Sequence, residues 1–206
     1  MKLRRRVITM LAALPLVPAL VSARTTALKP TPQDALGPFY PQKWTGEIDN
    51  DLRSFAGKNF LKGTPLALTG RVLSTDGKPL SGAKVEIWQT DDSGKYRHPG
   101  DDGEGPAKRG FQGFGRAVAD AEGRYAFRTI KPVLYSGRPP HVHFKVVASG
   151  HRELVTQMYF TGDNKARGFA LEFSKERDQL TVTPTSLRDS NRDALAAQFD
   201  LVLERT

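Results

Sequence analysis

The chain has 206 residues, with 31 Lys and Arg against 22 Asp and Glu, and it contains no cysteine. This length suits one domain that buries its own core. The absence of cysteine excludes disulfides, thiolate zinc sites and an anchor on a lipidated cysteine. The basic residues are scattered among acidic ones rather than gathered in a stripe, so we expect no nucleic-acid binding.

The N-terminus has the three parts of an export signal. Four of the first six residues are basic, an apolar stretch runs from Val7 to Val21, and Val21-Ser22-Ala23 is a small-residue cleavage pattern. We therefore expect a signal over residues 1–23 and an exported protein, by the general secretion route or by the twin-arginine route. The stretch is short and holds two prolines, so no stable membrane span is expected. Without these residues the formal charge falls from +9 to +5.

Residues 24–63 are rich in Pro, Gly and polar side chains and show no sustained period. They predict an irregular N-terminal arm. From residue 64 onward, short runs of β-forming residues alternate with turn signals, which predicts an all-β fold, an antiparallel β-sandwich with long irregular loops over residues 64–206. The expected strands are residues 66–73, 83–89, 115–119, 124–129, 141–149, 153–160 and 179–183.

Two later segments are less regular. The glycine-rich segment from Gly110 to Gly115 lacks the lysine of a phosphate-binding loop, so we expect a flexible surface loop. From Asp189 to Arg205, the apolar spacing of Leu195, Phe199 and Leu203 favours a short helical turn that leads into a last strand over residues 200–204.

The segment His141-Val142-His143 opens an apolar run. Residues i and i+2 of a strand point to the same face, so both imidazoles can reach one metal ion. Such a pair supplies only half of a site. A zinc or copper hydrolase would add a carboxylate. The available carboxylates lie in glycine-rich turns, where solvated side chains are expected. They belong to Asp91, Asp92, Asp101, Asp102 and Glu104. The turn that holds His151 predicts an exposed histidine.

Tyr96 and Tyr135 lie in loops and are candidates to complete the site. A phenol normally deprotonates near pH 10, yet a bound trivalent cation can remove its proton. Phenolate is a hard anionic ligand, which favours ferric iron over divalent zinc. The residues alone leave a second interpretation open, in which each tyrosine only packs its ring and donates a hydrogen bond.

Taken in order, several segments resemble the intradiol ring-cleavage dioxygenases, the non-haem ferric enzymes that include the protocatechuate and catechol dioxygenases. The matching segments cover nearly all of the chain after the expected signal. They are Gly37–Pro41, Gly82–Gln89, Gly94–His98, Tyr125–Pro132, Tyr135, Arg138–Phe144 and Thr156–Asp163.

The resemblance implies a site and a reaction. Tyr96 and His141 are the implied equatorial ligands of Fe(3+), and Tyr135 and His143 the axial pair. Arg138 is the implied arginine over the substrate ring, with Gln157 supporting it. The implied substrates are a catechol and O2, and the product is a cis,cis-muconate-type diacid. In this scheme Tyr135 leaves the iron and accepts a substrate proton.

The sequence leaves three matters open. Segments around Gly77–Val85 and Glu122–Phe127 also resemble transthyretin-like sandwich modules, so a non-catalytic exported binding module is the alternative. Only Ser136 and Gly137 separate Tyr135 from Arg138, a shorter link than in the protocatechuate enzymes, which leaves the choice of catechol undetermined. Exposed sheet edges and the arm are compatible with a homo-oligomer.

Overall fold

The computed structural model describes residues 27–44, 47–101, 105–162, 178–189 and 192–206. The expected export signal, Asp102 and Glu104 lie outside these residues. None of the described helices is long and apolar enough to cross a membrane.

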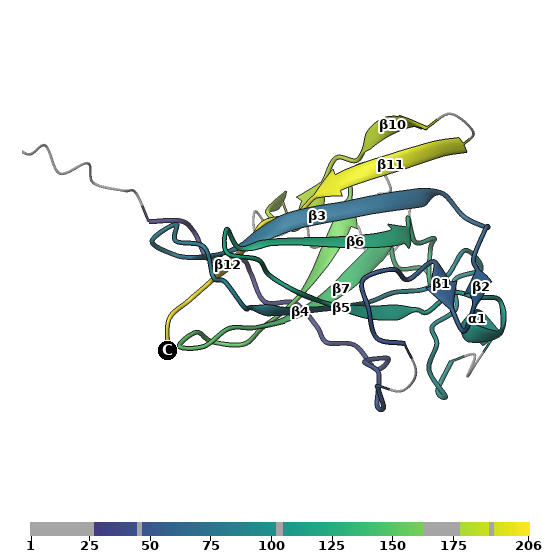
Figure 1. Ribbon diagram of the computed structural model, residues 1–206, viewed down its shortest axis with the longest axis horizontal. Coiled ribbons are helices and arrows are strands. Elements are labelled where there is room, and N and C mark those ends of the chain that lie inside the picture. The colour runs from purple at the N-terminus through teal and green to yellow at the C-terminus, as the bar shows by residue number, and fades with distance from the viewer. Residues whose placement is uncertain (1–26, 45–46, 102–104, 163–177, 190–191) are drawn as a thin grey trace, which may run out of the picture.

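Two five-stranded sheets pack face to face (Figure 1), which confirms the predicted sandwich. The first sheet has the order β10-β11-β3-β12, with β6 also paired to β3, and the second has the order β5-β4-β7-β8-β9. The strands of the first sheet are β3 (Pro65–Ser74), β6 (Arg124–Ile130), β10 (Thr185–Asp189), β11 (Arg192–Gln198) and β12 (Leu201–Leu203). Those of the second are β4 (Lys84–Trp88), β5 (Phe114–Val118), β7 (His141–Val147), β8 (Leu154–Phe160) and β9 (Thr181–Val182).

The core lies between the sheets and follows the two-residue period of the strands. Leu66 and Leu68 of β3 face Val142 and Phe144 of β7 within one buried cluster. Most neighbouring strands are antiparallel, but β11 and β12 pair in parallel with β3, and β9 pairs in parallel with β8. Besides the sandwich, the chain forms a small hairpin of β1 (Ser54–Phe55) and β2 (Lys58–Asn59) and one helical turn, α1 (Gly105–Lys108).

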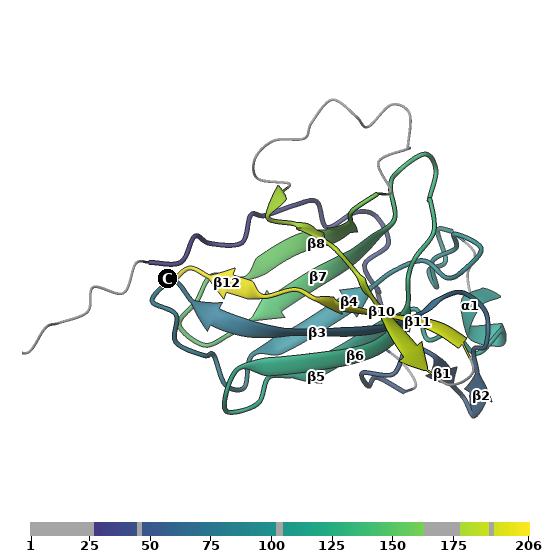
Figure 2. The ribbon, with the colours of Figure 1, turned by 90° about the horizontal axis from the view of Figure 1, so that it is seen from above.

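Residues 27–44 run along the β8 side of the sandwich as an irregular strap (Figure 2). Its backbone N–H groups donate to backbone carbonyls of the sandwich, from Thr31 to Val202 at 3.0 Å and from Asp34 to Val155 at 2.9 Å. Residues 27–44 are here called the arm. These bonds hold the arm against β8 and β12, although it forms no regular strand.

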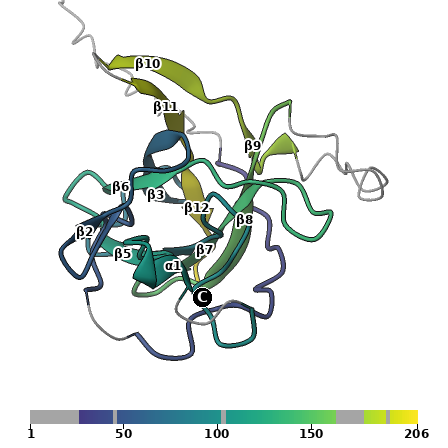
Figure 3. The same cartoon turned by 90° about the vertical axis from the view of Figure 1, so that its right-hand side faces the viewer.

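The predicted helical turn near the C-terminus is wrong. Residues 192–198 form β11, which leaves the body of the sandwich with β10 as a projecting hairpin (Figure 3). The apolar residues Leu195, Ala197, Phe199, Leu201 and Leu203 fit a period of two as well as a period of four. Pairing with β3 decides between the two periods. Both β11 and β12 pair in parallel with β3, and this pairing satisfies their backbone N–H and C=O groups.

The expected surface loop at Gly110–Gly115 is also wrong, because all six residues are buried. The ring of Phe111 is fully buried and packs on Phe60 with 5.1 Å between ring centroids. Burial of this ring stabilises the segment, and Gly110 and Gly113 adopt the positive φ values that let the backbone turn inward. His151 is partly buried rather than exposed, in a bridge with Arg205.

Candidate metal centre

One row of side chains crosses the outer face of the second sheet. On β7, Val142 and Phe144 enter the core, so His141 and His143 point to the opposite face. His143 lies between Trp88 of β4 and Gln157 of β8, and His141 lies opposite Tyr159 of β8. Antiparallel pairing therefore gathers residues from three distant parts of the chain at the end of one sheet.

Three possible ligand atoms converge on this face. The Tyr96 hydroxyl oxygen lies 3.2 Å from His141 Nε2 and 3.1 Å from His143 Nε2. All three side chains are at least 95 % buried. The Pro139 carbonyl lies 2.7 Å from His141 Nδ1 and places the imidazole proton there, which leaves Nε2 with its lone pair toward the cluster.

The protonation of these groups favours a cation. Burial, with His141 and Arg138 nearby, holds the pKa of His143 well below its ordinary value, so its imidazole is in the neutral form that binds metals. Burial also raises the pKa of Tyr96, which keeps the isolated phenol protonated. A bound cation of high charge would reverse this preference by stabilising the phenolate. Two imidazole nitrogens and one phenol oxygen thus fit a ferric ion.

Tyr96 is held by a loop with a buried carboxylate at each end. Asp91 accepts hydrogen bonds from the backbone N–H groups of Ser93 and Lys95 and forms an ion pair with Arg109. Asp101 accepts the backbone N–H of Tyr96 at 2.7 Å. The prediction that these carboxylates are solvated is therefore wrong for Asp91 and Asp101. Their side chains are buried because the backbone N–H groups of the loop need acceptors there.

Tyr135 lies beside the cluster but has a different hydroxyl partner. Its ring meets the Tyr96 ring edge-on, with 5.2 Å between centroids, and its hydroxyl donates to Asp101 Oδ1 at 3.5 Å. The structure brings all four expected ligands together, with three converging and Tyr135 turned to Asp101.

Arg138 and Gln157 form the pair that the sequence predicted. The Arg138 guanidinium donates to Gln157 Oε1 at 2.7 Å, and Gln157 Nε2 donates to the carbonyl of Ala35 at 2.7 Å. Tyr159 donates to Asp34 at 2.9 Å and lies 3.0 Å from Gln157 Oε1. The arm therefore fixes the glutamine that in turn fixes the arginine.

The contribution of the arm and of Trp88 was missed by the sequence reasoning. Phe39 stacks on Tyr96 with 4.8 Å between ring centroids, and a Cβ atom on Gly37 would lie 3.1 Å from His143 Cε1. Trp88 stacks on the other side of His143, with centroids 4.8 Å apart and the ring planes 8° apart. The contact of Trp88 with His143 follows from the pairing of β4 with β7, which no local pattern in the sequence encodes.

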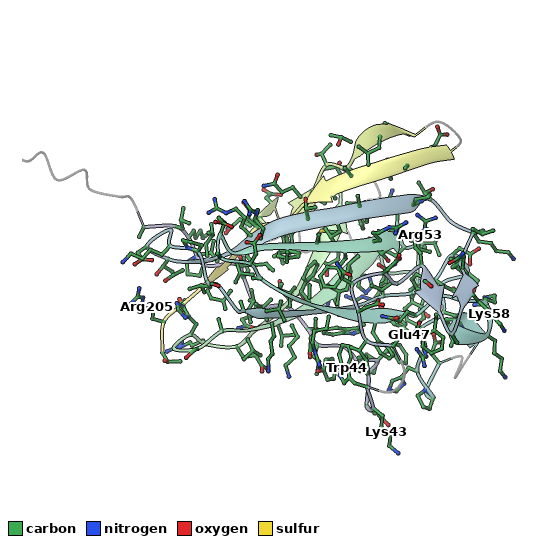
Figure 4. All side chains as sticks on the ribbon, in the orientation of Figure 1. Lys43, Trp44, Glu47, Arg53, Lys58 and Arg205 are labelled. Atoms are coloured by element: carbon green, nitrogen blue, oxygen red, sulfur yellow. The ribbon has the colours of Figure 1, made fainter. Side chains whose placement is uncertain are left out.

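Tyr40 and Trp44 anchor this part of the arm to the sheet. The Tyr40 hydroxyl donates to Glu86 at 2.8 Å, and burial together with this carboxylate raises the pKa of Tyr40 to about 12. Trp44, labelled in Figure 4, packs edge-on against Phe114 and lies under the Arg116 guanidinium. These contacts keep Phe39 over the candidate metal centre.

No three His, Cys, Asp or Glu side chains gather in the described residues. The carboxylate that a zinc or copper hydrolase would place beside His141 and His143 is thus missing from that part of the chain. The phenol of Tyr96 occupies the corresponding position.

Comparison with known proteins identifies the family. A sequence profile described as "Dioxygenase" matches residues 35–205. The protocatechuate 3,4-dioxygenase beta chain of Burkholderia cepacia is 43 % identical over 192 residues, covering 85 % of this chain and 80 % of that one. The chain belongs to the intradiol ring-cleavage dioxygenase family. Membership in this family contradicts the alternative prediction, in which the sandwich is a non-catalytic binding module.

Other intradiol dioxygenases are more distant. A hydroxyquinol 1,2-dioxygenase of Rhodococcus opacus is 32 % identical over 168 residues, and the match covers 68 % of this chain but 54 % of that protein. Among solved structures, the dioxygenase domain of a dioxygenase carbohydrate-binding protein fusion from Streptomyces sp. SirexAA-E superposes with a TM-score of 0.67 at 30 % identity. That match covers 86 % of this chain and all of the domain.

The buried carboxylate of Asp91 yields a test of the loop that holds Tyr96. We expect Asp91→Ala to lower the free energy of unfolding by about 2 kcal/mol, because it leaves two backbone donors and the Arg109 guanidinium without their acceptor. Thermal unfolding measures the change. Asp92→Ala is the matched control and should unfold like the wild type; equal stability of the two variants would contradict the role given to Asp91.

Proposed function

We propose that this protein is a ferric, non-haem intradiol dioxygenase. It would open a catechol between its two hydroxyl groups and add both atoms of O2, giving a cis,cis-muconate-type diacid. The observation that carries the proposal is the convergence of Tyr96 with His141 and His143 on one buried point. The dioxygenase relatives named above support the reaction class.

The fit of these residues assigns the ligands. Tyr96, His141 and His143 would hold the iron, and Tyr135 would complete the set from the adjacent loop. When bound, ferric iron draws electron density from a chelated catecholate and so makes the ring reactive toward O2. Trp88 and Phe39 wall the centre on two sides, which keeps water from the buried ligands.

Tyr135 is suited to hold a proton during substrate binding. A catechol that binds through both oxygens must lose two protons, and a released Tyr135 phenolate can accept one of them. Burial and the nearby Asp101 raise the pKa of Tyr135, which favours the protonated phenol and would help it hold a substrate proton. Its hydroxyl donates to Asp101 Oδ1 at 3.5 Å, and this acceptor would hold the phenol in its protonated form.

Arg138 would stabilise negative charge on the ring as it reacts. The guanidinium stays charged at any working pH, and its hydrogen bond to Gln157 fixes its position without neutralising it. A fixed positive charge of this kind lowers the free energy of the transition state because no reorganisation is needed during the reaction.

We further propose that the protein is exported, with residues 1–23 as its signal. The basic start, the apolar stretch and the cleavage pattern support this location. Export would place the enzyme where it meets catechols from outside the cell.

The ligand assignment has a visible consequence. Tyrosinate bound to ferric iron absorbs visible light by charge transfer, so we expect iron-loaded protein to be red. Tyr96→Phe should weaken this absorption markedly, because it removes one of the two phenolates, whereas Tyr125→Phe, in the core of the sandwich, should keep it. Protein that stays colourless after anaerobic iron loading and reoxidation would overturn the ligand set.

The reaction and its substrate are tested together. Oxygen uptake and diacid formation should be followed with catechol, protocatechuate and hydroxyquinol. We expect Arg138→Ala to lower kcat by about 100-fold, as when a fixed charge is removed from an active site, while Arg152→Ala on the surface leaves it unchanged. Products cleaved beside the diol would contradict the intradiol assignment.

The export proposal is tested by fractionating cells that express the full chain. We expect the mature protein outside the cytoplasm, shortened by about the length of an ordinary signal peptide. Replacing the basic residues of the first six should hold the protein in the cytoplasm at full length. Full-length wild-type protein found only in the cytoplasm would contradict export.

A further inference from the structure

Tyr135 and Arg138 are the two ends of one tight turn. The Arg138 N–H donates to the Tyr135 carbonyl at 2.8 Å, and the Tyr135 N–H donates to the Arg138 carbonyl at 3.2 Å. The two residues thus form an isolated antiparallel bridge. Only Ser136 and Gly137 lie between them, so this is a two-residue hairpin turn.

The turn has the backbone conformation of a type I′ turn. Ser136 has a φ of +44° and Gly137 a φ of +79°. Glycine adopts such values readily, but serine does so at a cost, and Asn-Gly is the sequence that this turn prefers. A strained Ser136 is retained only where the surrounding structure fixes the turn.

This geometry ties two functional side chains to each other. Residues directly opposite in an antiparallel pair project to the same face. Tyr135 is then restrained by the rings of Tyr96 and Phe39, and Arg138 by Gln157. The turn is a short rigid link between two side chains that are each held at the candidate metal centre.

We propose that Ser136 and Gly137 are positioning residues, which set the place of Arg138 relative to Tyr135. The inference rests on the proposed function, since it gives both side chains a role in ring cleavage. A longer link would remove the backbone restraint between the two residues and leave Arg138 held over the substrate ring by its hydrogen bond to Gln157 alone. The link would act mainly through its backbone, beside the hydrogen bond between the Ser136 and Tyr135 side chains.

Three variants of the iron-loaded full chain separate these effects. The first inserts two glycines between Ser136 and Gly137 and so lengthens the link. The second, Gly137→Ala, keeps the length but disfavours the positive φ; its new Cβ meets no atom within 4 Å, so no clash confuses the result. The third, Ser136→Ala, keeps the length of the link but removes the hydroxyl with its hydrogen bond to Tyr135, and it is the matched control for a role of that hydroxyl.

Catechol turnover, iron content and visible absorption are measured for each variant. We expect the insertion to lower kcat by about 50-fold, with KM, iron content and colour close to wild type, since the tyrosinate ligands remain while a fixed charge is displaced. Gly137→Ala should lower kcat by about fivefold, as expected for a cost of roughly one kcal/mol. Ser136→Ala should stay within about twofold, because its φ preference differs little from that of serine.

Two results would overturn the proposal. One is wild-type kcat in both the insertion and Gly137→Ala. The other is an equal loss in Ser136→Ala and Gly137→Ala, which would assign the effect to the hydroxyl. Should the insertion fail to fold, the comparison of the two point variants decides. A red, active wild type with unaffected variants overturns this inference alone, whereas a colourless, inactive wild type overturns the proposed function as well.

Discussion

The two-residue alternation of β7 is the constraint on which the site depends. Val142 and Phe144 anchor one face of this strand in the core, and their burial fixes the register of β7 against β4 and β8. His141 and His143 are then forced onto the opposite face, side by side. A shift of β7 by one residue in its register would turn the core residues outward and the two histidines inward. The register that stabilises the sandwich therefore also preserves the candidate metal centre.

The other half of the site comes from segments without regular structure. The Tyr96 loop is held by Asp91 and Asp101, which supply the acceptors that a strand would have supplied. The arm adds Phe39 above Tyr96 and hydrogen bonds to Gln157 and Tyr159. Loops that carry function need such partners, because they lack the ladder hydrogen bonds of a sheet.

Much of this could be predicted from the sequence, for identifiable reasons. Short β-forming runs between turns indicated the sandwich, and the His-x-His spacing indicated a shared face because strand geometry is local. The resemblance implied Tyr96, Tyr135, Arg138 and Gln157, and the structure places all four around the two histidines. Their roles as ligands and catalytic groups remain a prediction.

The predictions that were wrong concern segments whose structure depends on contacts with distant parts of the chain. The period of Leu195, Phe199 and Leu203 suits a helix or a strand, and only pairing with β3 settles it. The burial of Gly110–Gly115 depends on the Phe60 ring, fifty residues earlier in the chain. The positions of Gly37, Phe39 and Trp88 around the ligands likewise follow from tertiary packing that no local pattern encodes.

We propose that Tyr96, His141 and His143 together bind one ferric ion. The most direct measurement is a crystal structure of the iron-loaded protein with anomalous scattering recorded at the iron absorption edge. We predict a single strong peak between the Tyr96 hydroxyl oxygen and the two Nε2 atoms, within bonding distance of all three. A peak elsewhere, or no peak while these atoms stay hydrogen-bonded to one another, would contradict the account.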